Sequence, residues 1–256
     1  MNIFDCNTNI GHWPFRPVTE QNAPELASLL AKHHITHAAV GNINSLFYRN
    51  CHAGNRELAE ALKPFAGILY GVGTINPEYP GFDRDFCECV EKLNFRFLKL
   101  APTYHAYTLG KESANLTKLM KLAAEYKIPV IIPACVENFR QRHHLDVELP
   151  LDPAEVIAFA AKHPENVFIF TEGNPPPEQL SNAPRNLYIE LSRYRSAYGD
   201  ILGAVIQTIG AERVVFGSGA PYKEILPAQL KVNSVDSLAE ADKRKILFEN
   251  IHSFIA

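Results

Sequence analysis

Apolar runs alternate along the chain with segments whose apolar positions recur at helical spacing. The runs predict strands over residues 2–6, 35–41, 67–75, 95–100, 128–133, 167–171, 186–191 and 213–217. Between them, Asp152-Pro153-Ala154-Glu155 has the form of a capping box with proline in the first turn. Leu116, Leu119, Met120 and Ala123 share one face of another predicted helix. Strands that alternate with helices are expected to pair in parallel.

Eight strand–helix units in 256 residues are typical of an α/β fold of the closed (β/α)8 TIM-barrel type, here one domain over residues 1–256. An open doubly wound sheet is the alternative. It is less favoured because no Gly-x-Gly-x-x-Gly turn follows the first strand. In a TIM barrel the chemistry lies where each strand ends, so the residues just after the strands are the candidates for a site.

Composition narrows the classes of partner. The formal net charge is −3, from 25 basic and 28 acidic residues, so the chain lacks the basic excess of nucleic-acid binders. No apolar stretch approaches the roughly 20 residues that span a bilayer, and the first residues do not resemble a signal peptide. Five cysteines without a Cys-x-x-Cys pair favour a reduced, cytoplasmic protein. The oligomeric state stays open, a homo-oligomer included.

Six short motifs carry a resemblance to a known family. They are Asp5–Ile10, Gly54–Leu58, Phe97–Pro102, Pro129–Ile132, Phe216–Pro221 and Ile246–Ile251. In this order and spacing the chain resembles the amidohydrolase-related family, which includes aminocarboxymuconate-semialdehyde decarboxylases and metal-dependent TIM-barrel hydrolases. The first motif lies on the family's opening Asp-x-His-x-His, and the fifth is similar to its Phe-Gly-Ser-Asp-x-Pro. The resemblance implies a TIM barrel with a pocket at its mouth.

The metal-binding positions implied by this resemblance are changed. Asn7 and Asn9 stand where the family has its two opening histidines, and Pro133 where the fifth strand ends in histidine. The sixth-strand histidine falls at Thr171 or Glu172, and the eighth-strand aspartate becomes Gly219. A tight zinc site needs three or four good donors, and amide oxygens are poor ones. We therefore expect that the family's zinc is lost and that the chain has no metal site or other cofactor.

Three residues are candidates for catalysis without a metal. His105, in the loop after the fourth strand, is a candidate general base, although an ordinary surface-loop histidine is the more common explanation of a lone histidine. Cys135 would be a nucleophile if its pKa were depressed, and otherwise an inert, half-buried thiol. Glu172 is the one carboxylate that remains among the family's ligand positions.

Further polar residues predict a substrate pocket for an anion. They are Asn7, Asn9, His12, Lys99, Tyr104, Arg140, Arg142, His143 and His144. The cationic members follow the fourth and fifth strands, which are neighbours in a barrel, and arginine suits carboxylate recognition. The alternatives are a lysine paired at the barrel mouth and an ordinary solvated loop.

By analogy with the family we expect a metal-independent hydrolase or lyase that acts on a small carboxylated molecule. The expected partner is thus a small anionic ligand, not nucleic acid or a membrane. A catalytically inactive pseudoenzyme that binds a small ligand in the changed pocket is the alternative, and a structural barrel is a third. The sequence does not identify the substrate or the type of reaction.

Overall fold

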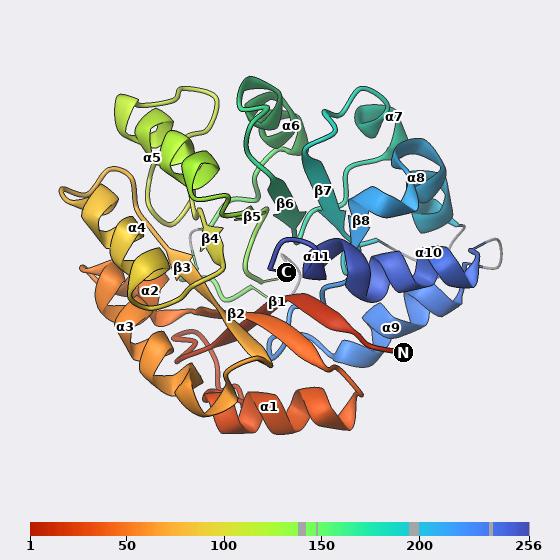
Figure 1. Ribbon diagram of the computed structural model, residues 1–256, viewed down its shortest axis with the longest axis horizontal. Coiled ribbons are helices and arrows are strands. Elements are labelled where there is room, and N and C mark those ends of the chain that lie inside the picture. The colour runs from red at the N-terminus through yellow and green to blue at the C-terminus, as the bar shows by residue number, and fades with distance from the viewer. Residues whose placement is uncertain (138–141, 147, 195–199, 236–237, 256) are drawn as a thin grey trace.

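The predicted (β/α)8 barrel is confirmed. The computed structural model describes residues 1–137, 142–146, 148–194, 200–235 and 238–255. Eight parallel strands follow one another in the order of the sequence (Figure 1). They are β1 (Phe4–Ile10), β2 (His37–Asn42), β3 (Leu69–Thr74), β4 (Phe97–Lys99), β5 (Val130–Pro133), β6 (Phe168–Thr171), β7 (Leu187–Glu190) and β8 (Val214–Val215). All eight predicted strands are present, with bounds shifted by a few residues.

The barrel closes between its first strand and the segment that follows its last one. Cys6 N donates to Phe216 O at 3.0 Å, and Asn9 N donates to Ala220 O at 2.9 Å. A parallel bridge also joins Thr8 to Ala220. The segment after β8 is therefore part of the barrel wall, which places residues 216–223 beside β1.

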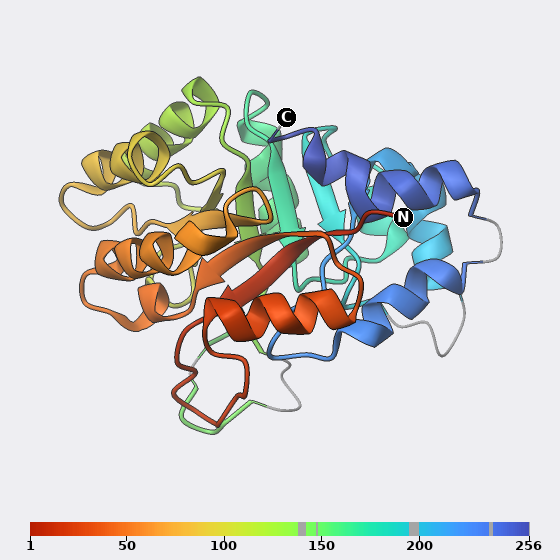
Figure 2. The same cartoon turned by 60° about the horizontal axis from the view of Figure 1, so that its bottom comes forward.

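Helices surround the strands (Figures 1 and 2). In chain order they are α1 (Ala23–Lys32), α2 (Asn44–Phe47), α3 (Cys51–Leu62), η1 (Lys63–Phe65), α4 (Phe82–Glu91), α5 (Ala114–Glu125), α6 (Pro153–Lys162), α7 (Pro177–Leu180), α8 (Ile201–Ile209), η2 (Ala211–Arg213), α9 (Ile225–Asn233), α10 (Glu240–Arg244), the π-helical η3 (Lys245–Glu249) and α11 (Asn250–His252). The predicted cap of α6 is present, because the Asp152 side chain accepts from Ala154 N. Of the residues described, no helix is long and apolar enough to cross a membrane.

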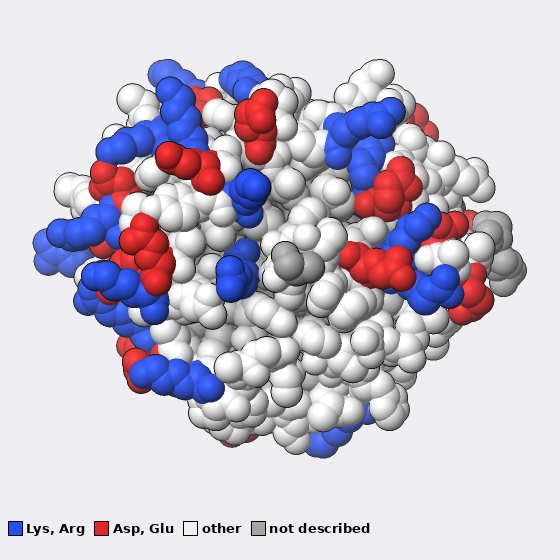
Figure 3. Space-filling view, in the orientation of Figure 1, with Lys and Arg blue, Asp and Glu red and all other residues white. Residues whose placement is uncertain are grey.

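Two apolar clusters stabilise the barrel. The larger one lies between the strands and the helices and includes the predicted buried face of α5. The smaller one lies inside the barrel, where Phe4, Phe97 and Ile169 pack together, and Ile251 of α11 covers its lower end. All seven residues of β1 are buried, so the polar side chains of Asp5, Asn7, Thr8 and Asn9 must be satisfied within the protein. On the face seen in Figure 3, basic and acidic side chains are interspersed at the periphery.

The Gly54–Leu58 motif has a structural explanation. Asn55 is fully buried on α3, where its Oδ1 accepts from Thr74 N at 2.9 Å and its Nδ2 donates to Thr74 O at 2.8 Å. Asn55 thereby satisfies the last residue of β3. A side chain at Gly54 would place its Cβ 2.8 Å from Ser45 N, so glycine lets the α2 region approach α3.

We expect Asn55→Ala to lower the free energy of unfolding by roughly 2–4 kcal/mol, because both backbone groups of Thr74 would lose their buried partner. Chemical denaturation measures this change. Asn115→Ala on the exposed side of α5 is the matched control, with an expected effect within about 0.5 kcal/mol. Equal stability of the two variants would contradict this role of Asn55.

Candidate functional site

The polar side chains of β1 point into the upper end of the barrel. The register of β1 against β2 shifts between Asp5 and Thr8, and such bulges redirect side chains. Asn7 Nδ2 donates to Glu172 Oε1 at 2.7 Å, and Asn9 Oδ1 accepts from Lys99 Nζ at 2.8 Å. The exposed fractions of these four residues lie between 5% and 8%. The structure thus brings together Asn7, Asn9, Lys99 and Glu172, which the sequence singled out.

Two cations that were not among the predicted site residues complete this group. Arg193 Nε lies 2.8 Å from Glu172 Oε2, and Lys223 Nζ forms an ion pair with the same oxygen. Arg193 comes soon after β7, and Lys223 soon after the Phe216–Pro221 motif, so their positions at strand ends were the available signal. We call Asn7, Asn9, Lys99, Glu172, Arg193 and Lys223 the central polar cluster.

Two glycines make room for this cluster. Gly219 has a φ of +79°, and a Cβ there would lie 2.7 Å from Glu172 Oε1 and 3.0 Å from Lys223 Cδ. The ion pair of Glu172 and Lys223 therefore fills the space that a side chain at position 219 would use. A Cβ at Gly41 would lie 2.7 Å from Lys99 Nζ, so this glycine admits the lysine to the barrel mouth.

The backbone of Glu172 is held in an uncommon conformation. Its φ is +60°, a left-handed value that a non-glycine residue seldom adopts. Glu172 N donates to Glu190 Oε2 at 3.1 Å, which helps to hold this turn after β6. Strain of this kind persists where the surrounding structure fixes it and is concentrated at functional sites.

The residues of this centre do not fit the zinc that the resemblance implies. Within the part of the chain that the structure describes, no three His, Cys, Asp or Glu side chains are arranged to hold a metal ion. Glu172 is already paired with two cations, and Asn9 is bonded to the Lys99 ammonium. A divalent cation placed among these groups would be repelled by all three positive charges.

Buried carboxyl groups lie next to the cluster. Asp5 is completely buried, and burial raises its pKa to about 7, although Oδ1 accepts from Asn7 N and Ser218 N at 3.0 Å. Burial also raises the pKa of Glu190, and the neighbouring charge of Glu172 adds to this shift. Ser192 Oγ donates to Glu190 Oε2 at 2.9 Å.

Lys99 is the group in the cluster suited to moving a proton near neutral pH. Burial lowers the pKa of its ammonium to about 8, while the charge of Glu172 acts in the opposite direction. A lysine with a pKa this close to neutrality can exist in both protonation states under ordinary conditions.

Cys135 does not meet the condition on which its role as a nucleophile depended. Arg193 Nη2 donates to its sulfur at 2.8 Å, but burial dominates and raises the pKa of the thiol to about 11. The thiolate is the reactive form, so this cysteine is expected to be largely unreactive at neutral pH. In the structure it supports Arg193.

His105 and His12, which the sequence placed at the mouth, make other contacts. His105 N donates to Ala101 O, and burial lowers the pKa of its ring to about 4, with an opposing contribution from Ser45. Such an imidazole is a weak base. His12 is exposed, and its Nδ1 lies 3.4 Å from Gln21 Oε1. Neither contact connects these residues to Glu172 or Lys99.

The described part of the loop after β5 carries acidic as well as basic side chains. Tyr104 OH donates to Asp146 Oδ1 at 3.1 Å, and Arg142 Nη1 donates to Glu148 O. His143 stacks on Phe15, with ring centroids 5.9 Å apart, and contacts the exposed His144 at 4.2 Å. Arg140 lies outside the described residues. Among the described residues of this loop, Glu137, Asp146 and Glu148 are buried acidic side chains.

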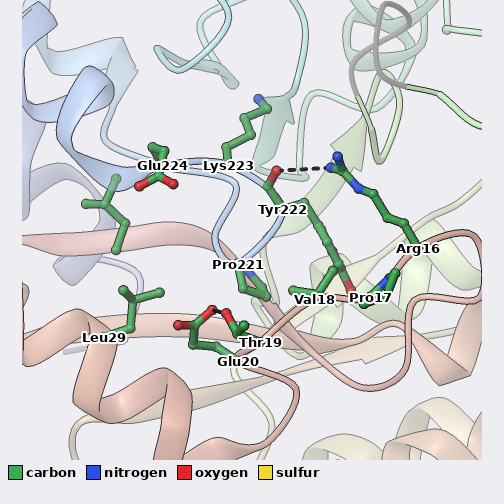
Figure 4. Close-up of a pocket in the computed structure, with 11 residues that line it drawn as sticks. Arg16, Pro17, Val18, Thr19, Glu20, Leu29, Pro221, Tyr222, Lys223 and Glu224 are labelled. Carbon is green, nitrogen blue, oxygen red and sulfur yellow. Dashed lines mark hydrogen bonds between the residues drawn. The ribbon is translucent and has the colours of Figure 1, made fainter.

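An aromatic cover lies over the barrel mouth, with an opening at its side. Trp13 packs against Phe15, Phe47 and Tyr222, and Phe47 also contacts Tyr104. Beside Tyr222 a cavity of about 320 Å³ (Figure 4) and a second one of about 380 Å³ share Arg16 and Lys223 in their walls. Since Lys223 also contacts Glu172, this side of the mouth leads toward the central polar cluster.

Fold and site together define a TIM-barrel protein whose strand ends carry a buried cluster of amides, cations and one carboxylate. A sequence model of the amidohydrolase family matches residues 6–254. The chain therefore belongs to the amidohydrolase family. None of the curated protein sequences matches it.

Several solved structures share the fold at low sequence identity. One is 2,6-dihydroxybenzoate decarboxylase from Rhizobium, with 16% identity, a TM-score of 0.70 and coverage of 99% of this chain and 97% of that one. Another is 5-carboxyvanillate decarboxylase from Sphingomonas paucimobilis, with 11% identity, a TM-score of 0.75 and coverage of 99% and 98%. A third is a dihydroxybenzoic acid decarboxylase from Polaromonas with bound manganese and the inhibitor 2-nitroresorcinol, with 16% identity, a TM-score of 0.70 and coverage of 99% and 97%.

The raised pKa of Asp5 predicts a pH dependence of stability. The pKa of Asp5 is higher in the folded protein than in the unfolded chain, so the protonated carboxyl stabilises the fold. This stabilisation is complete at pH values below the pKa of the unfolded chain and is lost as pH rises from 3.8 to about 7. Asn at position 5 keeps the accepting oxygen but cannot ionise. We therefore expect the stability of Asp5→Asn relative to the unsubstituted protein to improve by up to about 1.4 kcal/mol per pH unit across that window.

Denaturant unfolding of both proteins at several pH values between 4 and about 8 measures this difference. A difference between the two proteins that stays constant with pH would show that the pKa of Asp5 is not raised on folding.

Proposed function

We propose that the protein is a metal-independent lyase or hydrolase that acts on a small carboxylated molecule at the central polar cluster. The observation that carries the proposal is the Lys99 ammonium, which is 8% exposed and hydrogen-bonded to Asn9. Among the residues described, no carboxylate lies within ion-pair distance of it. A buried charge without a counter-ion is unfavourable, and a substrate carboxylate would provide one.

The neighbouring residues would hold Glu172 in place beside such a substrate. Arg193 and Lys223 hold Glu172 from one side, and Asn7 holds its other oxygen. Charged hydrogen bonds are strengthened in a site from which water is excluded. The cluster would thus bind a carboxylate with Lys99 while Glu172 stays fixed by its own partners.

Of the two reactions, loss of CO2 suits this centre better than hydrolysis. Hydrolysis in a metal-dependent relative relies on water activated by the metal, and the residues here do not fit one. Decarboxylation needs a group that positions the carboxylate and an acid that protonates the carbon. The bonding pair of the broken C–C bond remains on that carbon, which takes a proton from the Lys99 ammonium, and Lys99 regains its proton from solvent. The similarity to decarboxylases of hydroxylated aromatic acids supports this choice of substrate class.

A catalytically inactive protein that binds a small ligand is the second candidate. It is favoured by the aromatic cover over the mouth, where Trp13 is 1% exposed, and by the extensive pairing within the central polar cluster. Such a protein would bind carboxylates without turning them over. A structural barrel would do neither.

We expect Lys99→Met to reduce kcat/KM for a carboxylated substrate by about 100-fold or more, the usual contribution of a general acid. The assay uses protein treated with a chelator and a panel of small aromatic and aliphatic acids, with CO2 release as the readout and thermal shift to report binding. The exposed Lys121→Met on α5 is the control and should leave the rate unchanged. Activity that appears only with added metal, or that survives Lys99→Met, would overturn the proposal.

The pH profile provides an independent check. Because the proposed acid is protonated Lys99, kcat/KM should be constant below a pH of about 8 and fall tenfold per unit above it. Steady-state rates between pH 6 and about 10 measure the profile. A rate that increases through this range would instead identify neutral Lys99 as a base and contradict the assigned proton transfer.

A further inference from the structure

A pocket opens beside the central polar cluster, between the segments that follow β7 and β8. Its volume is about 380 Å³, and we call it the lateral pocket. Its walls include Arg16, Ser192, Ser218, Tyr222, Lys223, Glu224 and Lys231. Three of these residues are cations, and one is a carboxylate.

Lys231 is the cation of the lateral pocket that lacks a counter-ion. It lies on α9, where Nζ donates to the backbone oxygen of Ser192. In the described part of the chain no carboxylate lies within ion-pair distance of Lys231, although Glu190 contributes at longer range. Burial lowers the pKa of this lysine, and the charges of Lys223 and Arg193 lower it further. The protein thus keeps a partly buried ammonium next to other positive charges.

The other two cations have partners but retain donors. Arg16 forms an ion pair with Glu137 and has a side chain 37% exposed. Lys223, which contacts Glu172, also donates to Ser192 Oγ at 3.1 Å. In Figure 4 the head groups of Arg16 and Lys223 extend away from Thr19 and Glu20, and the carboxylate of Glu224 is directed away from Arg16.

We propose that the lateral pocket binds a phosphate-sized dianion carried by a small molecule. Lys231 brings a charge without a counter-ion to this cavity, and Arg16 and Lys223 keep N–H donors beside their ion pairs, so a bound anion could accept from three cationic groups. The location agrees with this, because phosphate groups in TIM barrels frequently bind to the loops after strands seven and eight and the start of the next helix. α9 begins at this pocket, and its N-cap residue Glu224 makes no side-chain capping hydrogen bond.

This site goes beyond the proposed function and does not depend on it, because anion binding can be measured without turnover. Calorimetric titration of the full chain with inorganic phosphate and with methyl phosphate tests it, with acetate as the monoanionic comparison. We expect both phosphates to bind more tightly than acetate. Lys231→Met should weaken phosphate binding by about tenfold or more, as expected for the loss of a charged hydrogen bond.

Two matched variants and one independent readout complete the test. Lys231→Arg, which keeps the charge, should retain phosphate binding, and the exposed Lys121→Met on α5 should not affect it. In the unsubstituted protein, amide NMR shifts caused by phosphate should be concentrated at residues 192 and 223–231, a result that does not require any variant to fold. The proposal is overturned if phosphate does not bind, if acetate binds as tightly, or if the shifts lie elsewhere.

Discussion

The ion pairs of Glu172 with Arg193 and Lys223 determine how the upper end of this barrel is built. They connect the segments after β6, β7 and β8, and they occupy the space next to Gly219 that a side chain would otherwise fill. Removal of one partner from a buried pair leaves an uncompensated charge, which is strongly unfavourable. The left-handed backbone at Glu172 and the bond from its N–H to Glu190 are consistent with a position fixed by its surroundings.

The same interaction is the basis of the proposed chemistry. In the proposed function, the positive charge that a metal ion would supply comes from side chains, with Lys99 held by Asn9 and two further cations held by Glu172. A lysine differs from a metal ion in that it can lose its charge by releasing a proton. This difference favours chemistry that needs a proton donor over chemistry that needs an activated water.

Much of the fold could be predicted from the sequence, because strand–helix alternation and caps such as Asp152 are local signals. The positions of Asn7, Asn9 and Glu172 followed from the resemblance, and the structure brings them together with Lys99. The loop after β5 was less predictable. Its arginines and histidines suggested a positive surface, whereas the described part also holds buried acidic residues, with Tyr104 bonded to the Asp146 carboxylate and Arg142 to the backbone oxygen of Glu148. Charge partners across loops depend on tertiary structure, which also explains why Lys223 was missed.

The most direct test of the account is a crystal structure of the protein grown with excess zinc and measured at the zinc absorption edge. The account predicts no anomalous peak between Asn7, Asn9 and Glu172, with the Lys99 ammonium bonded to Asn9 and with Glu172 paired to Arg193 and Lys223. A strong peak bound by Glu172, with the lysines displaced, would contradict the claim that side-chain cations have replaced the metal.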